Sequence, residues 1–565
     1  MTVGGESVDT PNDIVESFAN FFGSVYQQSN NFTAPQNDIP LESLSNISIA
    51  VLSESDILTS LKLLKNKPTA GCDDIPSFII RDCANVFVAP LLTIFNLSLR
   101  TSTYPDAWKV AKICPIFKGG NSSEVKDYRP ISIIPNFSKA FERCIYDKIF
   151  PQVRPLINLE QHGFINNRST VTNLACFLQY AHHTIGDKQQ LDVVYTDFSK
   201  AFDKMDHGIL CRKMHLIGFH PKLIQFFQSY LHNRQQFVAY NGYLSDRFVA
   251  VSGAPQGSNL APLLFSIFIN DITCGVSSKV LMFADDLKIF RVIRSYDDCV
   301  LLQEDLQTIS MWCATNKLPL NTKKCKKITI SLKSNEIPFD YTLEDNSLEH
   351  SDCVRDLGVY IDKKLNFNYH INEITQNALK TLGFLIRSTH HFCNHASLIT
   401  LYNTLVKPKL DYATVVWSPI YNSSIDKLEY VQRRFLKYLS FKVDGVYPQR
   451  GANHLQLLNR FEFLSLKNVR ILRSLIFLYK LCNNMIDSPG LLHQLNFLVP
   501  TANTRSQNVF YPNTPNTNLA SKAPLHQACL HLNDINSRVG IDMFHCTITV
   551  FKKSVLDCLK NLQKH

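Results

Sequence analysis

Three acidic residues at the ends of strand-like runs are the side chains best suited to carry chemistry in this sequence. Asp285 and Asp286 are adjacent at a bend between two short apolar runs, residues 280–283 and 287–290, which predicts a hairpin. Adjacent carboxylates between buried strands repel each other and lose solvation, so a hard divalent cation would offset the cost. The alternative is an exposed Asp-Asp turn, which any fold can contain.

A third carboxylate strengthens the metal hypothesis. Asp197 ends the strand-like run 191–197, and a helix-like segment, residues 198–207, follows it. If the two strands are neighbours, Asp197 meets Asp285 and Asp286 at one end of a sheet. Three carboxylates there can hold two Mg²⁺ ions roughly 3.5–4 Å apart, as polymerases and nucleases do for in-line phosphoryl transfer. The expected cofactor is Mg²⁺, as two ions, and Mn²⁺ could replace it.

Five short motifs give the sequence a resemblance to a known family. Each motif alone is weak evidence for a family, but the five motifs in this order and spacing are specific evidence. They are Asp127-Tyr128-Arg129-Pro130-Ile131-Ser132, Gln161-His162-Gly163-Phe164, Tyr195-Thr196-Asp197-Phe198-Ser199-Lys200-Ala201-Phe202-Asp203, Gly253-Ala254-Pro255-Gln256-Gly257-Ser258 and Phe283-Ala284-Asp285-Asp286. From about residue 51 to its end, the chain resembles the reverse transcriptases of non-LTR retrotransposons, most closely the jockey-like elements of arthropods.

The resemblance implies an α+β fold of the right-hand polymerase type. Fingers and a palm with an antiparallel sheet would be followed by a helical thumb and a C-terminal extension. The expected parts are a polar, linker-like segment (1–50), a helical N-terminal extension (51–107), the fingers and palm (108–362), a basic helical thumb (363–480) and a C-terminal extension (481–565).

The resemblance also implies how the acidic site works. Asp197, Asp285 and Asp286 would be catalytic, and they would bind the metal ions together with the backbone carbonyl of Phe198. Lys324 would be the general acid that protonates the leaving pyrophosphate. Its neighbours Lys323 and Lys326 stay open as alternatives, and so does an ordinary solvated basic loop.

Five residues are expected to contact the incoming nucleotide. Lys118 and Arg129 would bind its triphosphate, since arginine offers a planar fork and lysine a compact charge to phosphate oxygens. Phe202 would be the steric gate that excludes a ribose 2′-hydroxyl. Gln256 and Gly257 would lie against the nascent base pair and the sugar. The alternatives are a surface lysine at 118, a structural arginine at 129 and a core aromatic ring at 202.

Other polar residues in these motifs are predicted to be structural. His162 is not assigned a catalytic role, because a lone histidine is more often a hydrogen-bonded structural residue. Asp203, Asp206 and His207 are interpreted as caps and ion-pair partners of a helix over 208–218. The segment 484–540, rich in Asn and Pro, is expected to be irregular.

The charge distribution indicates where a polyanion binds. The chain has 565 residues and a net charge of +10. Residues 363–480 hold seventeen Lys and Arg against six Asp and Glu, so this part carries +11 and the remainder about −1. A basic C-terminal half favours nucleic-acid binding. The alternative is a set of solvated helix faces.

Cysteine usage and hydropathy restrict the class of protein. The sixteen cysteines include no CxxC pair, which argues against a zinc knuckle and a secreted disulfide framework. No basic-then-apolar signal opens the sequence, and no run of about eighteen apolar residues is recognised, so no membrane span is expected. The predicted location is intracellular, in the nucleus or the cytoplasm.

These observations predict an RNA-directed DNA polymerase, a nucleotidyltransferase that extends a primer 3′-hydroxyl. Its expected partners are an RNA template, a DNA primer or target, and deoxynucleoside triphosphates, without a membrane. Related elements carry an endonuclease before this region, so that activity is expected from elsewhere. One alternative is a catalytically silent, retrotransposon-derived protein that binds RNA and DNA. A DNA-templated polymerase or a maturase-like splicing factor is another.

Overall fold

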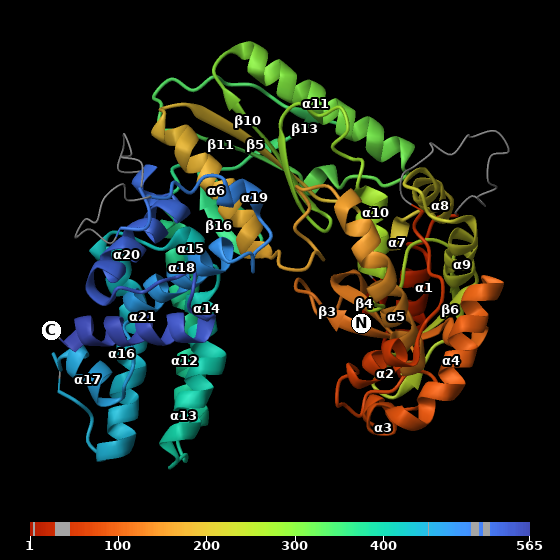
Figure 1. Cartoon of the computed structure of the whole chain (residues 1–565), viewed down its shortest axis with the longest axis horizontal. Coiled ribbons are helices and arrows are strands. Elements are labelled where there is room, and N and C mark those ends of the chain that lie inside the picture. The colour runs from red at the N-terminus through yellow and green to blue at the C-terminus, as the bar shows by residue number, and fades with distance from the viewer. Residues whose placement is uncertain (4–5, 29–45, 450, 499–507, 512–519, 565) are drawn as a thin grey trace.

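The strands that carry the acidic residues form one five-stranded sheet in the computed structural model (Figure 1). Its order is β14 (Glu349–His350), β11 (Lys326–Ile330), β5 (Gln190–Thr196), β10 (Asp286–Ile293) and β9 (Lys279–Phe283). All neighbours are antiparallel except β11 and β14. The structure describes residues 1–3, 6–28, 46–449, 451–498, 508–511 and 520–564.

Both faces of this sheet are covered, which explains why its strands are apolar almost throughout. Val193 and Phe290 pack with α6 (Thr170–Gly186) on one face. Val194 and Ile289 pack with α11 (Tyr296–Thr315) on the other. Because successive side chains of a strand point to opposite faces, both sets of alternating positions are buried.

A second sheet and a group of helices are built mainly from the N-terminal half. The sheet contains β3 (Val110–Phe117) between β4 (Tyr128–Ile133) and β6 (Arg234–Tyr240), and both β7 (Tyr243–Leu244) and β8 (Phe248–Ala250) pair with β6. A short pair, β1 (Thr2–Val3) and β2 (Glu6–Ser7), precedes them. The helices are α1 (Pro11–Gly23), α2 (Glu54–Lys62), α3 (Ser77–Asp82), α4 (Ala84–Thr101), α5 (Asn136–Val153), α7 (Ala201–Lys204), α8 (His207–Leu216), α9 (Pro221–Leu231) and α10 (Ala261–Ile269).

Within residues 1–50, the apolar stripe of Phe18, Phe21 and Phe22 predicts a helix, and the structure forms α1 there. Phe18 and Phe22 of that helix are buried against Ile113 of β3 and Val238 of β6. The apolar stripe of the helix therefore covers the second sheet. Residues 29–45 of the predicted linker lie outside the described residues.

The C-terminal half is mostly helical, in agreement with its sequence pattern. It begins with the hairpins β12 (Thr342–Leu343) to β13 (Asn346–Ser347) and β15 (Cys353–Asp356) to β16 (Val359–Asp362). Its helices are α12 (Asn368–Ser388), α13 (His395–Leu401), α14 (Lys407–Asp411), α15 (Thr414–Trp417), α16 (Asn422–Asp444), α17 (His454–Arg460), α18 (Leu466–Cys482), α19 (Pro489–Leu492), α20 (Pro524–Val539) and α21 (Ile548–Lys564).

Helix α20 corrects the prediction that residues 484–540 are irregular. Its Leu525, Ala528, Leu532 and Ile535 recur at helical spacing and are buried with side chains of α18. The surrounding Asn and Pro residues obscured this stripe in the sequence. Parts of the predicted irregular segment, 499–507 and 512–519, lie outside the described residues.

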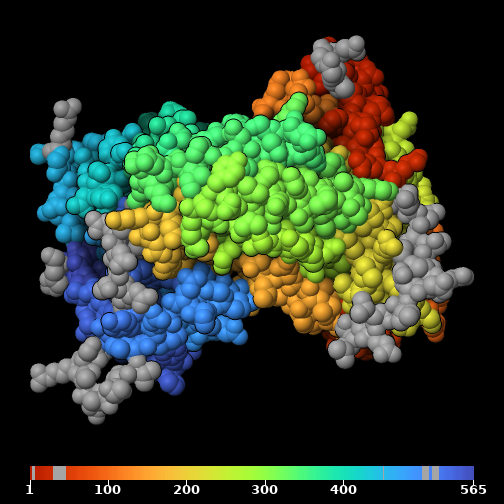
Figure 2. Space-filling model, turned by 90° about the horizontal axis from the view of Figure 1, so that it is seen from above, coloured from red at the N-terminus to blue at the C-terminus, as the bar shows by residue number. Residues whose placement is uncertain are grey.

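The central sheet stands between the two groups of helices. Figure 1 shows α1–α5 and α7–α10 on one side and α12–α21 on the other, with the sheet and α11 above them. Seen from above in Figure 2, the green segment that includes α11 lies between the red-to-yellow N-terminal part and the blue C-terminal part. The sheet edge that carries the acidic residues therefore lies between two helical groups.

One helix departs from the expectation that no segment could span a membrane. By length and composition alone, α4 is apolar enough to do so, which is weak evidence because a core helix passes the same test. Leu91 and Phe95 of this helix are buried in the same core as Ile57 and Leu61 of α2. Val86, Ile94 and Leu97 of the same helix are exposed.

Candidate active site

The strand register brings the three predicted carboxylates together. Thr196 of β5 lies opposite Leu287 of β10, and the Thr196 hydroxyl donates to the Leu287 carbonyl at 3.2 Å. Asp197 and Asp286 are the next residues on these two neighbouring strands, and Asp285 precedes Asp286 in the turn from β9. The carboxylates therefore meet at one end of the sheet, as the sequence predicts.

The acids at this edge influence one another electrostatically. Burial raises the pKa of Asp285, the nearby Asp197 raises it further, and Arg129 opposes the shift. Asp286 is open to solvent on one side, yet its pKa rises to about 6, first because surrounding protein displaces water and then because of Asp285, Asp356 and Asp197. Each acid makes ionisation of its neighbours less favourable, so a cation at this edge would be stabilising.

The three carboxylates are suitable ligands for a hard divalent ion, although their side chains are not yet grouped into a metal site. Within the described ranges, no three Asp, Glu, His or Cys side chains are already grouped closely enough to hold a metal. The three carboxylates nevertheless supply oxygen ligands of the kind that Mg²⁺ prefers. An ion would require small adjustments of these side chains and displacement of the lysine that contacts Asp197.

The backbone of Phe198 is oriented in a way that allows its carbonyl to act as a further ligand. Phe198 and Leu320 form an isolated antiparallel bridge. The hydrogen bonds of this bridge join the residues before and after the pair, at 2.7 and 2.9 Å. In such a pair the central N–H and C=O groups point away from the partner segment, so the Phe198 carbonyl is not used by this bridge.

Of the three candidate lysines, only Lys324 contacts a predicted catalytic acid. Its ammonium lies 3.2 Å from the Asp197 carboxylate, and its side chain is 67% exposed. Lys326 is paired with Glu349 at 3.0 Å instead. Lys323 is exposed, and no ion pair to it is found in the described part of the chain. Geometry thus favours Lys324, the residue that the resemblance indicated.

The β3–β4 hairpin brings two cationic residues toward the acids. Arg129 is exposed on β4 and acts electrostatically on Asp285. Lys118 follows β3, and its pKa is lowered by burial and by the nearby Lys324, while Asp197 opposes that shift. The hairpin and the acidic edge therefore present opposite charges to a common space.

The loop that holds Gln256 and Gly257 is attached to β4. The Ser132 N–H donates to the Gln256 carbonyl at 2.8 Å. Gly257 has φ +130°, and a Cβ there would lie 2.5 Å from the Ser132 carbonyl oxygen. Only glycine allows this close approach. The structure thus joins Gln256 and Gly257 to the strand that carries Arg129.

Asp203 has a role that the sequence analysis missed. The prediction of a helix cap or an ion-pair partner is wrong for this residue, because its buried carboxylate accepts the Gln256 side-chain N–H at 2.8 Å. His207 is likewise bonded to the Gly253 carbonyl, at 2.7 Å. The third residue of that group, Asp206, does cap a helix, because it accepts the Ile209 N–H at the start of α8. Asp203 therefore orients Gln256.

The position of the Phe202 ring is compatible with both predictions for it, a steric gate and a core aromatic ring. It stacks on Phe265 with ring centroids 4.4 Å apart and meets the exposed Phe164 edge-on at 5.9 Å. The ring is half-buried rather than enclosed. One side belongs to the core and another remains accessible to a ligand.

Gln161 and Gly163 hold the turn that precedes the paired acids. The Gln161 side-chain oxygen accepts the N–H of Ala284 at 2.9 Å and that of Gly163 at 2.7 Å. A Cβ on Gly163 would lie 2.2 Å from the Ala284 nitrogen, so only glycine fits there. His162 donates its backbone N–H to Met282 at 2.8 Å. The motif flagged these residues, but sequence alone did not reveal this contact.

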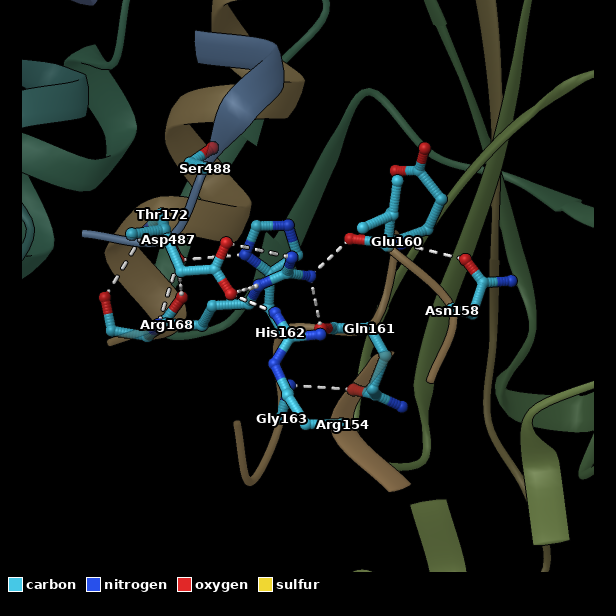
Figure 3. A network of polar contacts seen from close by, with 12 residues as sticks. Arg154, Asn158, Glu160, Gln161, His162, Gly163, Arg168, Thr172, Asp487 and Ser488 are labelled. Atoms are coloured by element: carbon cyan, nitrogen blue, oxygen red, sulfur yellow. Dashed lines mark hydrogen bonds and ion pairs between the residues drawn. The ribbon is translucent and has the colours of Figure 1, made fainter. Parts of the chain in front are cut away.

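A polar network continues from this motif to the C-terminal part of the chain (Figure 3). Arg168 donates to the backbone carbonyls of Leu159 and Gln161, the latter at 2.9 Å, and its Nε lies 3.2 Å from Asp487. Arg154 pairs with the same carboxylate. Asp487 follows α18, so the helical C-terminal part is linked to the segment that supports the acidic turn.

A cavity of about 360 Å³ lies beside the acids. It extends from Asp197 and Asp286 to the residues of β15, which ends at Asp356. The Lys288 ammonium lies 2.5 Å from Asp356, and both side chains are buried. This ion pair fixes the β15–β16 hairpin against β10 and thereby shapes the cavity.

Comparison with known proteins defines the class of this site. Residues 116–386 match the family described as reverse transcriptase (RNA-dependent DNA polymerase). This part of the chain is therefore similar to a reverse transcriptase domain, and it contains all the predicted site residues. The relatives described next are polymerases of mobile elements.

Curated relatives come from mobile elements of Drosophila melanogaster. The chain is 26% identical to the probable RNA-directed DNA polymerase from transposon BS, over 80% of this chain and 51% of the relative. It is 29% identical to the RNA-directed DNA polymerase from mobile element jockey, over 70% of this chain and 44% of the relative. The chain thus spans about half the length of these relatives.

A solved structure of apo telomerase from Candida tropicalis, truncated from the C-terminal domain, also matches. The match covers 46% of this chain and 54% of the telomerase chain, at 14% identity and a TM-score of 0.31.

Proposed function

We propose that this chain is an RNA-directed DNA polymerase of the non-LTR retrotransposon kind, which adds deoxynucleotides to a primer 3′-hydroxyl along an RNA template. The observation that carries the proposal is the register of β5 and β10, which places Asp197 beside Asp285 and Asp286. The reverse transcriptase match over residues 116–386 supports it. In this proposal the fold is a right hand, with the β3–β4 hairpin as part of the fingers and the five-stranded sheet as the palm.

Asp197, Asp285, Asp286 and the Phe198 carbonyl would hold the divalent ions, two Mg²⁺ in the full proposal. When bound, such ions lower the pKa of an attacking hydroxyl and neutralise charge on a leaving phosphate. Lys324, whose ammonium lies 3.2 Å from Asp197, would give a proton to the leaving pyrophosphate.

The remaining site residues would hold the nucleotide. Arg129 and Lys118 bind the triphosphate oxygens, because the hairpin presents them toward the acidic edge. Gln256 is held by Asp203 and would contact the nascent base pair. The half-buried ring of Phe202 would exclude a ribose 2′-hydroxyl, which favours deoxynucleotides.

The basic helices of residues 363–480 would grip the template–primer duplex. Their net charge of +11 supports contact with phosphates, which is tolerant of sequence and sensitive to salt. We propose that the chain acts inside the cell, on nucleic acid in the nucleus or the cytoplasm. All sixteen cysteines are free, which fits a reducing compartment.

Primer extension tests the proposal. Purified protein receives a DNA primer annealed to an RNA template, Mg²⁺ and deoxynucleotides, beside an Asp285→Asn/Asp286→Asn double variant. A matched control, Asp297→Asn, changes an exposed acid at the start of α11. Extension by the wild type and the control, but not by the double variant, supports the polymerase. Duplex binding by folded wild-type protein without extension would overturn it and favour the silent binding protein.

A further inference from the structure

Arg470 is a buried arginine that lacks partners. It lies in α18 and is 3% exposed, and its Nε and Nη2 atoms have no hydrogen-bond partner among the described residues. Burial lowers its pKa to about 10, with Glu429 and Asp411 opposing from a distance. A buried guanidinium without a close counter-charge is costly, so it needs a compensating anion.

The nearby acids are already engaged with other groups. Glu429 accepts the Lys467 backbone N–H at 2.8 Å and lies 3.3 Å from His454. Asp411 pairs with Arg473 at 3.4 Å. Neither carboxylate forms an ion pair or a hydrogen bond with Arg470 in the described part of the chain.

Arg470 lines a cavity of about 170 Å³ in the C-terminal helical part. Lys467 and Lys522 also line it, and so does His531, whose buried Nδ1 lacks a partner. Of the described residues that form its wall, none is acidic. Ser418, Ser474, Thr414 and Gln527 are the other polar residues of the lining, and apolar side chains such as Ile425 and Ile471 form the rest of the wall. The lining thus combines positive charge with unused hydrogen-bond donors.

A helix N-terminus adds to this positive surface. Helix α20 begins at Pro524, which lines the cavity. Its N-cap residue, Ala523, has no side-chain acceptor, and the Leu525 N–H in the first turn donates instead to the Gln179 side-chain oxygen at 3.1 Å. The partial positive charge at a helix N-terminus favours an anion. The helix N-terminus belongs to α20 and the unpaired guanidinium to α18, so the two observations are independent.

We propose that this cavity is a phosphate-binding site. It would take one phosphate group, either from the backbone of a bound nucleic acid or as free inorganic phosphate. A guanidinium fork matches phosphate oxygens, and lysines at the rim add charge. The volume is far above the roughly 10–15 Å³ that one water molecule needs, so a tetrahedral oxyanion fits. The site lies among α15, α18 and α20, apart from the acidic edge of the sheet (Figure 1).

Thermal unfolding of the full chain in inorganic phosphate tests the binding. At constant ionic strength, phosphate should raise the Tm of the wild type in a saturable way. Arg470→Met should abolish this rise without lowering the Tm in chloride, because it removes an uncompensated charge. The matched control Arg434→Met, at an exposed position of α16, should keep the rise. If Arg470→Met fails to fold, Lys522→Gln at the half-buried rim should weaken the phosphate response instead.

Binding of a short oligoribonucleotide distinguishes the two sources of phosphate. If the backbone of RNA occupies the cavity, Arg470→Met weakens RNA binding more than Arg434→Met does, and the slope of log K against log salt falls by about one. If the ligand is free phosphate, RNA affinity stays unchanged while the Tm response disappears. The proposal is overturned if the Arg470 and Arg434 variants respond alike to both phosphate and RNA.

Discussion

The side-chain oxygen of Gln161 accepts the backbone N–H of Ala284 at 2.9 Å, directly before the paired acids. Ala284 has φ +58°, a left-handed conformation that costs a non-glycine residue about 1–2 kcal/mol. The hydrogen bond compensates part of that strain. Gln161 therefore fixes the direction in which Asp285 and Asp286 leave the turn.

Replacing Gln161 with Met should misplace the acids while keeping most of the side-chain volume. The Ala284 N–H would lose its buried acceptor, which costs about 1–3 kcal/mol of unfolding free energy. A small displacement of catalytic groups can lower the rate by roughly 10²-fold. Urea denaturation and the kcat of primer extension measure the two effects.

The matched control is Gln303→Met, which removes a comparable contact to the Thr342 backbone away from the acids. It should leave kcat unchanged. A Gln161→Met protein with wild-type kcat would show that the turn is held without this hydrogen bond.

Asp487→Asn should weaken the link between the C-terminal helices and the acidic turn. Arg168, whose side chain is 1% exposed, would lose the charge that faces it. A hydrogen bond to a charged group contributes about 1.5–3 kcal/mol, and partial exposure of Asp487 places the loss toward the lower end. We expect lower kcat with little change in duplex affinity. The control is Asp534→Asn, which removes the charge of an exposed carboxylate that pairs with Arg538.

Local signals in the sequence predicted much of the fold. The capping box at Ser53 and Asp56, a pattern that is visible in the sequence, marks the start of α2. Alternating and continuous apolar runs placed β5 and β10, and their terminal acids then indicated the site. These predictions succeeded because strand and helix patterns, caps and turns are set by residues close together in the chain.

The supporting contacts could not be predicted in the same way. Asp203 is predicted to serve the helix over 208–218, yet it holds Gln256, 53 residues later. Asp487 reaches Arg168 across 319 residues. Spacing along the chain carries no information about such contacts, because they depend on how distant elements pack. The same limit hid the α1 contact with the second sheet.

The stability of the protein should decrease on acidification through His162. Burial, together with the cationic Arg168 and Lys288, lowers the pKa of this imidazole from 6.5 to about 3. The unfolded chain therefore takes up a proton between these values and the folded protein does not. Unfolding free energy is fully retained above about pH 6.5 and falls by up to roughly 1.4 kcal/mol per pH unit below it.

His162→Gln should reduce that pH dependence, as measured by urea denaturation between pH 5 and 7. The control His350→Gln, at an exposed position, should keep the wild-type slope. Equal slopes in wild type and His162→Gln would contradict the assignment, whatever the absolute stability of the variant.

The choice among the three lysines can be made by comparing Lys324→Gln with Lys326→Gln. Lys324 lies 3.2 Å from Asp197, whereas Lys326 is paired with Glu349. If Lys324 gives a proton to the leaving pyrophosphate, its loss should lower kcat by roughly 10²-fold or more, with little change in the KM for deoxynucleotides. Lys326→Gln should retain kcat. Because a glutamine cannot donate a proton as an ammonium does, the pH–rate profile of Lys324→Gln should also lose its alkaline limb. A raised KM with unchanged kcat would instead make Lys324 a binding residue.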